Sequence, residues 1–350
     1  MFAQSSVTLY GRLDAAARYT KNDGVGSIKS LANTGNSSSR FGVLGSEDLG
    51  DGLRATFWLE SSVGVDVGTA GGSAVANQFW DRESNFGLVS KKYGEIRLGY
   101  DLTQPYNMWG NVDPYSHVGV GGSGNLYQGS QVGPVQAAFG SDRNVGTTIR
   151  ARNMVQYFLP QEALGGIYGG VFAAPGEGGT TANAANKYTG FSLGYSRGKT
   201  FDIGAAYALT QNDRTGTNKF KESVVAGFYD FDVVKLSAAW RKFELTTAAQ
   251  KLYFVAAYVP VGLGAFKFSY QKSDMAGSVG AVKIDANDAS QIAVGYVYNL
   301  SKRTALYTTY ARISNKGAAT NVIPGGPAVT AAAFGGHTSQ GVDFGLRTIF

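Results

Sequence analysis

The sequence has 350 residues, a formal net charge of +6 and a charged fraction of 16%. It contains no cysteine and only two histidines, His117 and His337, which excludes a disulfide framework and a thiolate metal site and disfavours a histidine metal site or a Ser/His triad. No lysine- or arginine-rich run supports nucleic-acid binding, and no stretch of about eighteen consecutive apolar residues supports a transmembrane helix.

The chain begins with MFAQSSVTLYG. The letters FAQ resemble the small-residue end of a signal-peptide cleavage site to which an initiator Met has been added. We therefore interpret residues 1–4 as a remnant of processing and expect an exported protein whose cleaved signal peptide is absent from this sequence. A native cytosolic start is the alternative.

From residue 6 onward, apolar and polar residues alternate at every second position, which is typical of β-strands with two different faces. No segment shows a helical period of useful length. The pattern predicts roughly sixteen strands, an even number. In chain order they cover residues 6–19, 38–48, 53–61, 82–90, 96–100, 147–158, 166–174, 187–196, 200–209, 222–231, 233–244, 251–260, 264–273, 290–300, 304–313 and 341–350.

The connections between these strands alternate in length. The short ones are 49–52, 91–94, 160–165, 196–199, 230–232, 260–263 and 299–303. The long ones are 20–37, 62–81, 101–147, 174–187, 211–221, 274–288 and 313–339, and only 245–250 breaks the rule. An up-and-down sheet with one trimmed end and one elaborated end is typical of outer-membrane barrels, which have short periplasmic turns and long external loops.

The two faces of the strands differ in polarity. One face carries Gly, Ala, Val, Leu and Phe, and the other carries charged side chains such as Arg12, Asp14, Arg54 and Glu60. A barrel of this many strands is too wide for side chains to fill, so the polar face would line an aqueous channel and the apolar face would contact lipid. Aromatic residues gather near the predicted strand ends, as interfacial girdles require.

Several motifs carry a family resemblance: SSVTLYGRLDAA (5–16), SSRFGVLGSEDLGDGLRATFWLES (38–61), DRESNFGLVSKKYGEIRLGYD (81–101) and GLRTIF (345–350). The sequence resembles the general porins of Gram-negative β-proteobacteria of the Neisseria, Burkholderia, Bordetella and Comamonas type. The resemblance implies a single antiparallel 16-stranded transmembrane β-barrel over residues 1–350. It also implies a homotrimer among the lipid and lipopolysaccharide of the outer membrane, and passive diffusion of small solutes and ions with a preference for anions.

The longest connection, 101–147, has little strand pattern, and the resemblance implies that it is the constriction loop folded into the lumen. It contains Asp113, together with Asp101, His117, Asp142 and Arg143. By alternation, Arg40 and Glu60 point into the lumen. On the strand after the loop, alternation places Ile149, Ala151, Val155 and Tyr157 towards lipid, and therefore Arg150 and Arg152 towards water.

Opposed charges in a narrow passage select ions by sign. We expect Arg40, Arg82, Arg150 and Arg152 to form the basic side of the constriction, with Glu60 and Asp113 as its acidic side. The resemblance supports Arg40 and Glu60 most directly. Arg82 rests on the resemblance alone, because alternation places it on the lipid face with Phe86 and Leu88.

The last ten residues, GVDFGLRTIF, alternate up to the terminal Phe350. This predicts a closing strand that pairs with the first one and so removes both sheet edges. In the porins that the sequence resembles, such a terminal aromatic is also the signal read by the outer-membrane assembly machinery.

Three other functions were weighed. A solute-specific porin for a sugar or a carboxylate would need an aromatic track in the lumen, part of which Trp58, Tyr106, Trp109 and Tyr115 could supply. An outer-membrane barrel enzyme would need a histidine beside a serine or an acid. A soluble β-rich binding protein would not need a lipid face. GVGGSG (119–124) does not join a strand to a helix, so a phosphate-binding loop is disfavoured, and no cofactor or metal is expected.

Overall fold

A computed structural model describes residues 5–71, 78–128, 132–140, 146–176, 187–211 and 219–350. Residues 1–4, which we interpreted as a remnant of processing, lie outside this range, as do Asp142 and Arg143 of the predicted constriction loop. No helix in the described ranges is long and apolar enough to cross a membrane.

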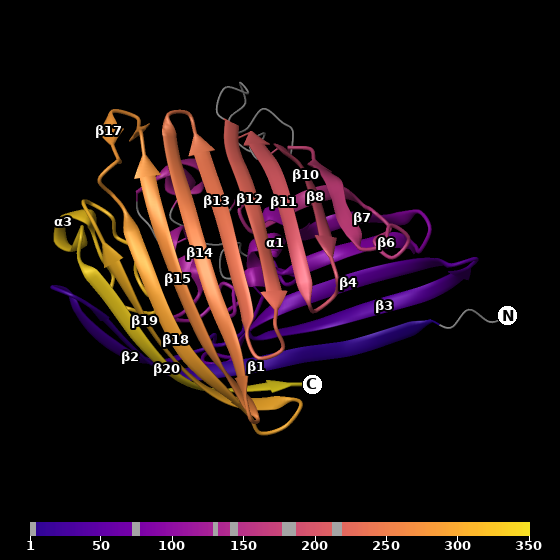
Figure 1. Ribbon diagram of the computed structural model, residues 1–350, viewed down its shortest axis with the longest axis horizontal. Coiled ribbons are helices and arrows are strands. Elements are labelled where there is room, and N and C mark those ends of the chain that lie inside the picture. Colours follow the sequence, from indigo (N-terminus) through magenta and orange to yellow (C-terminus); the bar gives the residue numbers. More distant parts are fainter. Residues whose placement is uncertain (1–4, 72–77, 129–131, 141–145, 177–186, 212–218) are drawn as a thin grey trace.

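Sixteen antiparallel strands close into a barrel (Figure 1). They are β1 (Ser6–Asn22), β3 (Arg40–Gly50), β4 (Leu53–Gly64), β6 (Glu83–Ser90), β7 (Gly94–Leu102), β8 (Arg150–Phe158), β9 (Ile167–Ala174), β10 (Lys187–Ser196), β11 (Phe201–Gln211), β12 (Lys219–Asp230), β13 (Lys235–Leu245), β14 (Ala248–Val261), β15 (Gly264–Ala276), β18 (Ala289–Asn299), β19 (Thr304–Asn315) and β20 (Thr338–Ile349). Each strand pairs with its neighbours in chain order, as predicted.

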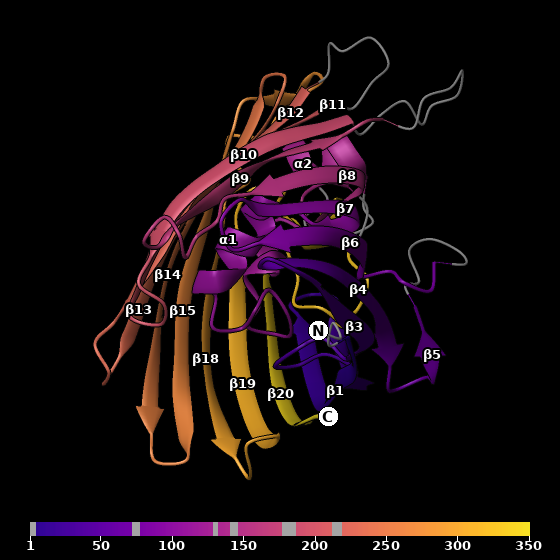
Figure 2. The same ribbon diagram turned by 90° about the vertical axis from the view of Figure 1, so that its right-hand side faces the viewer.

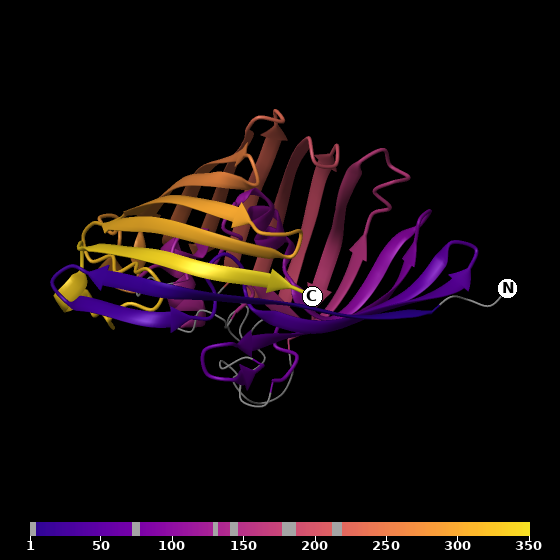
Figure 3. The same cartoon turned by 90° about the horizontal axis from the view of Figure 1, so that it is seen from below.

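The barrel closes where β20 pairs with β1, with Ala16 opposite Gly345 and Arg18 opposite Asp343. Figure 3 shows the two strands side by side, β20 in yellow and β1 in indigo. Beyond the strand, Phe350 and Gly11 exchange two backbone hydrogen bonds of 3.0 Å. This confirms the prediction that the last strand pairs with the first one.

The remaining elements lie in the connections. They are β2 (Gly26–Ala32), β5 (Thr69–Ala70), α1 (Gln104–Val112), the 3₁₀ turn η1 (Ser123–Leu126), α2 (Pro134–Phe139), β16 (Ser278–Val279), β17 (Val282–Lys283) and α3 (Ala331–Phe334). The sequence predicted only a loop over 20–37. Instead, β1 runs on to Asn22 and β2 folds back along it, because Gly24 and Gly26 adopt positive φ angles of 76° and 141° in the turn between them.

The two faces of the strands have the predicted polarity. On β1 the outward Val7 is 70% exposed, whereas the inward Asp14 is fully buried; on β20, Phe344 is 65% exposed and Asp343 is fully buried. An outer face that exposes large apolar side chains while acids are enclosed is the pattern of a barrel that is surrounded by lipid.

One stretch departs from simple alternation. In β8, Met154 pairs with Gly99 but Ala151 pairs with Asp101, so β8 uses one residue more than β7. This β-bulge lies at Asn153, whose φ is 56°. A bulge reverses the alternation on one side of itself. Ile149 and Ala151 were therefore wrongly predicted to face lipid: both are buried, and Ala151 packs in a cluster with Met154.

Candidate functional site

The site is centred on the carboxylate of Glu60, which is fully buried on β4. Arg40 Nη1 lies 3.2 Å from Glu60 Oε1 and 3.3 Å from Oε2. Arg82 Nε donates to Oε1 at 2.6 Å, and the hydroxyl of Tyr10 donates to Oε2 at 2.8 Å. One carboxylate thus holds two guanidinium groups through charge-assisted hydrogen bonds, which are stronger than hydrogen bonds between neutral groups.

Arg82 reaches this carboxylate because it precedes β6. Its backbone N–H donates to the carbonyl of Glu60 at 3.2 Å, and the strand begins only at Glu83. The alternation of β6, which exposes Phe86 and Leu88, therefore does not set the direction of the Arg82 side chain. The prediction that alternation would turn Arg82 towards lipid is wrong for this reason.

Arg150 extends the group of arginines. Its Nε donates to the backbone carbonyl of Arg82 at 2.6 Å, and its guanidinium lies within electrostatic range of Arg82, Glu83 and Tyr106. Arg152 does not join them: its side chain is exposed, and its Nη2 lies 3.5 Å from Gln78 Oε1.

The sequence analysis missed Arg12 as a member of this group. Arg12 lies directly opposite Arg40 in the pairing of β1 with β3, and it is within electrostatic range of Glu60 and Arg82. The signal was present, since Arg12 is on the polar face of the first strand. Alternation does not determine the register between β1 and β3, and it is this register that places Arg12 opposite Arg40.

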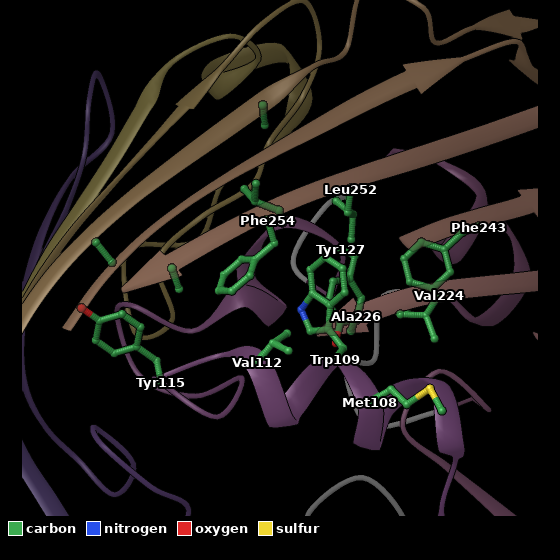
Figure 4. Close-up of a cluster of buried hydrophobic side chains, with 14 of the residues drawn as sticks. Met108, Trp109, Val112, Tyr115, Tyr127, Val224, Ala226, Phe243, Leu252 and Phe254 are labelled. Carbon is green, nitrogen blue, oxygen red and sulfur yellow. The ribbon is translucent and has the colours of Figure 1, made fainter. Parts of the chain in front are cut away.

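The described part of the predicted constriction loop lies inside the ring of strands, where Figure 2 shows α1. Its apolar side chains Met108, Trp109 and Val112 form one buried cluster with residues of β11 to β14, among them Val224 and Phe254 (Figure 4). Burial of side chains of this size stabilises by about 1.5–3 kcal/mol each. The loop is therefore held against the wall of β11 to β14, whereas Arg40 and Glu60 lie on β3 and β4.

A buried ion pair lies beneath the loop. Arg241 Nη2 is 2.5 Å from Glu222 Oε1, and both side chains are almost completely enclosed. The Arg241 guanidinium also lies 4.7 Å from the ring centroid of Tyr127 and 4.7 Å from that of Phe243. Its Nη2 donates to the carbonyl of Thr148 at 3.0 Å, so this pair connects the wall to both the middle and the end of the loop.

Asp113 has a different environment from the one expected. Its carboxylate accepts backbone N–H groups from Tyr115, His117 and Ser123 at 2.8, 2.9 and 3.0 Å. These bonds fold the turn after α1, and no arginine is paired with Asp113 in the described part of the chain. The structure thus brings together Arg40, Arg82, Arg150 and Glu60, and it places Asp113 and Arg152 apart from them.

His117, Trp109 and Tyr115 of the loop are also buried. The ring of His117 stacks on Tyr106 with 3.9 Å between centroids, and burial lowers the pKa of His117 to about 4. Trp109 and Tyr115 are fully buried in the cluster beneath the loop. Of the four aromatics considered for a solute track, only Trp58 and Tyr106 retain exposed surface, so the structure offers no continuous track from this set.

Comparison with known proteins agrees with this architecture. A family model described as Gram-negative porin matches residues 1–318. The chain belongs to the Gram-negative porin family. It is 34% identical to Outer membrane porin protein 32 of Delftia acidovorans, over 99% of this chain and 95% of the relative, and 27% identical to an outer membrane porin protein of Bordetella pertussis, over 87% and 88%.

Solved structures of porins have the same fold as this chain. An anion-selective porin from Comamonas acidovorans superposes with a TM-score of 0.82 at 32% identity, covering 99% of this chain and all of that one. OmpT of Vibrio cholerae, at 14% identity and a TM-score of 0.68, shares the fold. This porin is therefore a passive channel of the Gram-negative outer membrane, and its family and fold are those of a channel rather than of an enzyme.

Proposed function

We propose that this porin prefers anions, and that Arg40, Arg82 and Arg150 form the basic side of its constriction, with Arg12 beside them and Glu60 as their acidic partner. The observation that carries the proposal is the convergence of Arg40 and Arg82 on one carboxylate. Arginine suits this role because it stays charged at every working pH and offers a fixed fork of donors to an anion.

The charges in this group do not cancel. The guanidinium groups within reach are those of Arg12, Arg40, Arg82, Arg150 and Arg347, and the carboxylates within reach are those of Asp14, Glu60, Asp81 and Glu83, which leaves an excess of one positive charge (5 − 4). An excess positive charge in a narrow, partly desolvated passage attracts anions and repels cations. The relative from Comamonas acidovorans is itself described as anion-selective.

The experiment is a pair of substitutions, Arg40→Ala with Arg150→Ala, examined by reversal-potential measurements in a KCl gradient. We expect the ratio of anion to cation permeability to fall. The matched control is Arg197→Ala with Lys199→Ala, which removes two positive charges from an exposed turn. An unchanged reversal potential in the first variant would exclude this assignment. Arg152 and Asp113 are left out because neither contacts the group.

We also propose that Phe350 acts in barrel assembly. Its ring lies over Gly11, where a Cβ atom would come within 2.4 Å of Phe350 Cζ. The terminal aromatic therefore depends on a glycine opposite it in the closing pair of strands, and the two backbone hydrogen bonds to Gly11 fix its position. Until β20 pairs with β1, the ring of Phe350 does not have this partner, so the assembly machinery could bind it before the barrel closes.

We propose further that the outer face contacts outer-membrane lipid and lipopolysaccharide, and that part of it is covered by neighbouring copies in a homotrimer. An apolar groove of about 590 Å³ runs over the outside of β1, β4, β6 and β7 between Val7, Phe57, Phe86 and Leu98. Cross-linking in membranes that yielded only monomers would exclude the trimer.

A further inference from the structure

A second set of basic side chains lines a recess beside residues 110–116 of the loop. The recess adjoins the arginine group, because its Arg347 lies within electrostatic range of Arg12. The recess has a volume of about 390 Å³ and lies between residues 110–116 of the loop and the wall of β13, β14, β15, β18 and β20. Lys235, Lys267 and Arg347 line it. Lys235 and Lys267 are near the starts of β13 and β15 and Arg347 is near the end of β20, so the recess lies towards the short turns of the barrel.

The positive charge in this recess is only partly compensated: Asp113 and Asp14 attract Lys267 electrostatically, while Arg347 repels it. No carboxylate lies within 4.0 Å of these three cations among the described residues. Lys267 Nζ is 2.5 Å from Asn36 Oδ1, which is a neutral partner. Lys235 Nζ lies 3.4 Å from the ring centroid of Phe228, and Asp202 and Asp230, which attract it, do not line the recess.

The two acids nearest to the recess keep their negative charge, but their oxygens accept hydrogen bonds from groups other than Lys235, Lys267 and Arg347. Asp113 lines it, but its oxygens accept three backbone N–H groups within the loop. Asp14 is opposite Arg347 in the pairing of β1 with β20, yet its carboxylate accepts the backbone N–H groups of residues 35–37 and the hydroxyl of Tyr307. Arg347 Nε is buried and has no hydrogen-bond partner in the described ranges.

Buried donors are normally satisfied, and an unpartnered one calls for a ligand or water. We infer that this recess is a second anion site, in which Lys235, Lys267 and Arg347 hold a small oxyanion that carries two negative charges. Two or more separated cations favour a dianion over chloride, because each additional charge pair adds to the attraction in a partly enclosed site. The neutral donors of Asn111 and Asn299, which also line the recess, can complete its hydrogen bonding.

The site follows the arginine group along the path of a permeating ion. An anion that has passed Arg40 and Arg82 would enter a region that still carries positive charge, instead of meeting a barrier behind the constriction. Conduction requires sites that attract the ion but release it again. The inference rests on the open porin lumen and does not require that the arginine group sets selectivity.

Sulfate is the probe, because it is a dianion at every working pH. In planar bilayers with KCl, sulfate added on the short-turn side is expected to reduce the chloride current of the wild-type porin saturably. Lys235→Gln with Arg347→Gln should raise the half-blocking sulfate concentration about tenfold, which corresponds to about 1.4 kcal/mol.

Lys302→Gln with Arg303→Gln is the matched control, since it removes two exposed positive charges at the same end of the barrel. Its half-blocking sulfate concentration should stay within about twofold of wild type.

Three further variants guard against misfolding. Arg347→Lys keeps the positive charge and should be blocked at about the wild-type sulfate concentration, whereas each single Gln variant should raise the half-blocking concentration by about threefold. Lys267 is not substituted, because it also bonds Asn36 and its carbonyl accepts the hydroxyl of Tyr115.

The inference is overturned if sulfate gives no saturable block of the wild-type porin, or if the recess and control variants respond alike. A negative result for this second anion site can be told apart from a negative result for anion preference. The arginine group is tested by reversal potential without sulfate, and the recess is tested by sulfate block.

Discussion

Replacing Glu60 by Gln removes the carboxylate that bonds both Arg40 and Arg82, while it retains the shape of the side chain and an amide oxygen that can still accept a hydrogen bond from one of them. The positive excess of the group rises by one charge. We therefore expect Glu60→Gln to increase the preference for anions, which is the opposite direction from Arg40→Ala with Arg150→Ala.

The size of the effect follows from Coulomb's law. For an ion that passes about 5 Å away in a water-filled lumen, one unit charge is worth about 0.8 kcal/mol, and the sign is opposite for anion and cation, so their difference is about 1.6 kcal/mol. At 0.1 M salt the Debye length of about 10 Å reduces this difference to about 1 kcal/mol. The ratio of anion to cation permeability should therefore rise about fivefold.

The assay is the reversal potential in KCl gradients centred near 0.1 M and near 1 M. At 1 M the Debye length is about 3 Å, and the change should fall below about twofold. The control is Glu162→Gln, which removes an exposed charge from a short turn. A shift towards cations, or an equal shift in both variants, would show that the group around Glu60 does not set the field in the lumen.

Two further predictions concern the parts that hold the channel together. Glu222→Gln leaves Arg241 buried without its counter-charge, and we expect the free energy of unfolding to fall by about 3–5 kcal/mol, seen as faster heat unfolding in detergent. The control Glu244→Gln removes only the partly exposed partner of Lys242 and should cost about 1 kcal/mol or less. Equal effects of the two substitutions would contradict the prediction. Gly11→Val should displace the ring of Phe350 and slow folding into lipid vesicles, but it should have little additional effect in a Phe350→Ala background; additive effects would mean that the contact is unimportant.

The strand order and the barrel could be predicted from the sequence because each strand faces two different environments. That forces alternation, and alternation with unequal loops sets the number and direction of the strands. β2 was missed because it pairs with residues 16–22 at the end of β1 and is fixed by the turn at Gly24 and Gly26. Nothing in a single sequence distinguishes such a hairpin from a glycine-containing loop.

The site was predictable to the extent that alternation holds. Arg40 and Glu60 lie within regular strands, and both point where alternation places them. Arg82 precedes its strand, and Ile149 and Ala151 lie beyond the bulge at Asn153, so alternation gave the wrong direction for these three side chains, whose backbone is irregular. Asp113 could not be placed from sequence, because three backbone groups that are two to ten residues further along the chain decide what it contacts.

The two sides of the constriction are held by different forces, and this separates pore size from selectivity. The loop side rests on apolar burial of Met108, Trp109 and Val112 against β11 to β14, which salt does not screen. The opposite side rests on charge, with Arg40 and Arg82 held by Glu60. Salt in the physiological range therefore changes the field that a passing ion meets without moving the loop. We therefore expect a substitution at Glu60 to alter ion preference while the loop stays in place, and a substitution under the loop to alter the width of the passage while the arginines keep their partner.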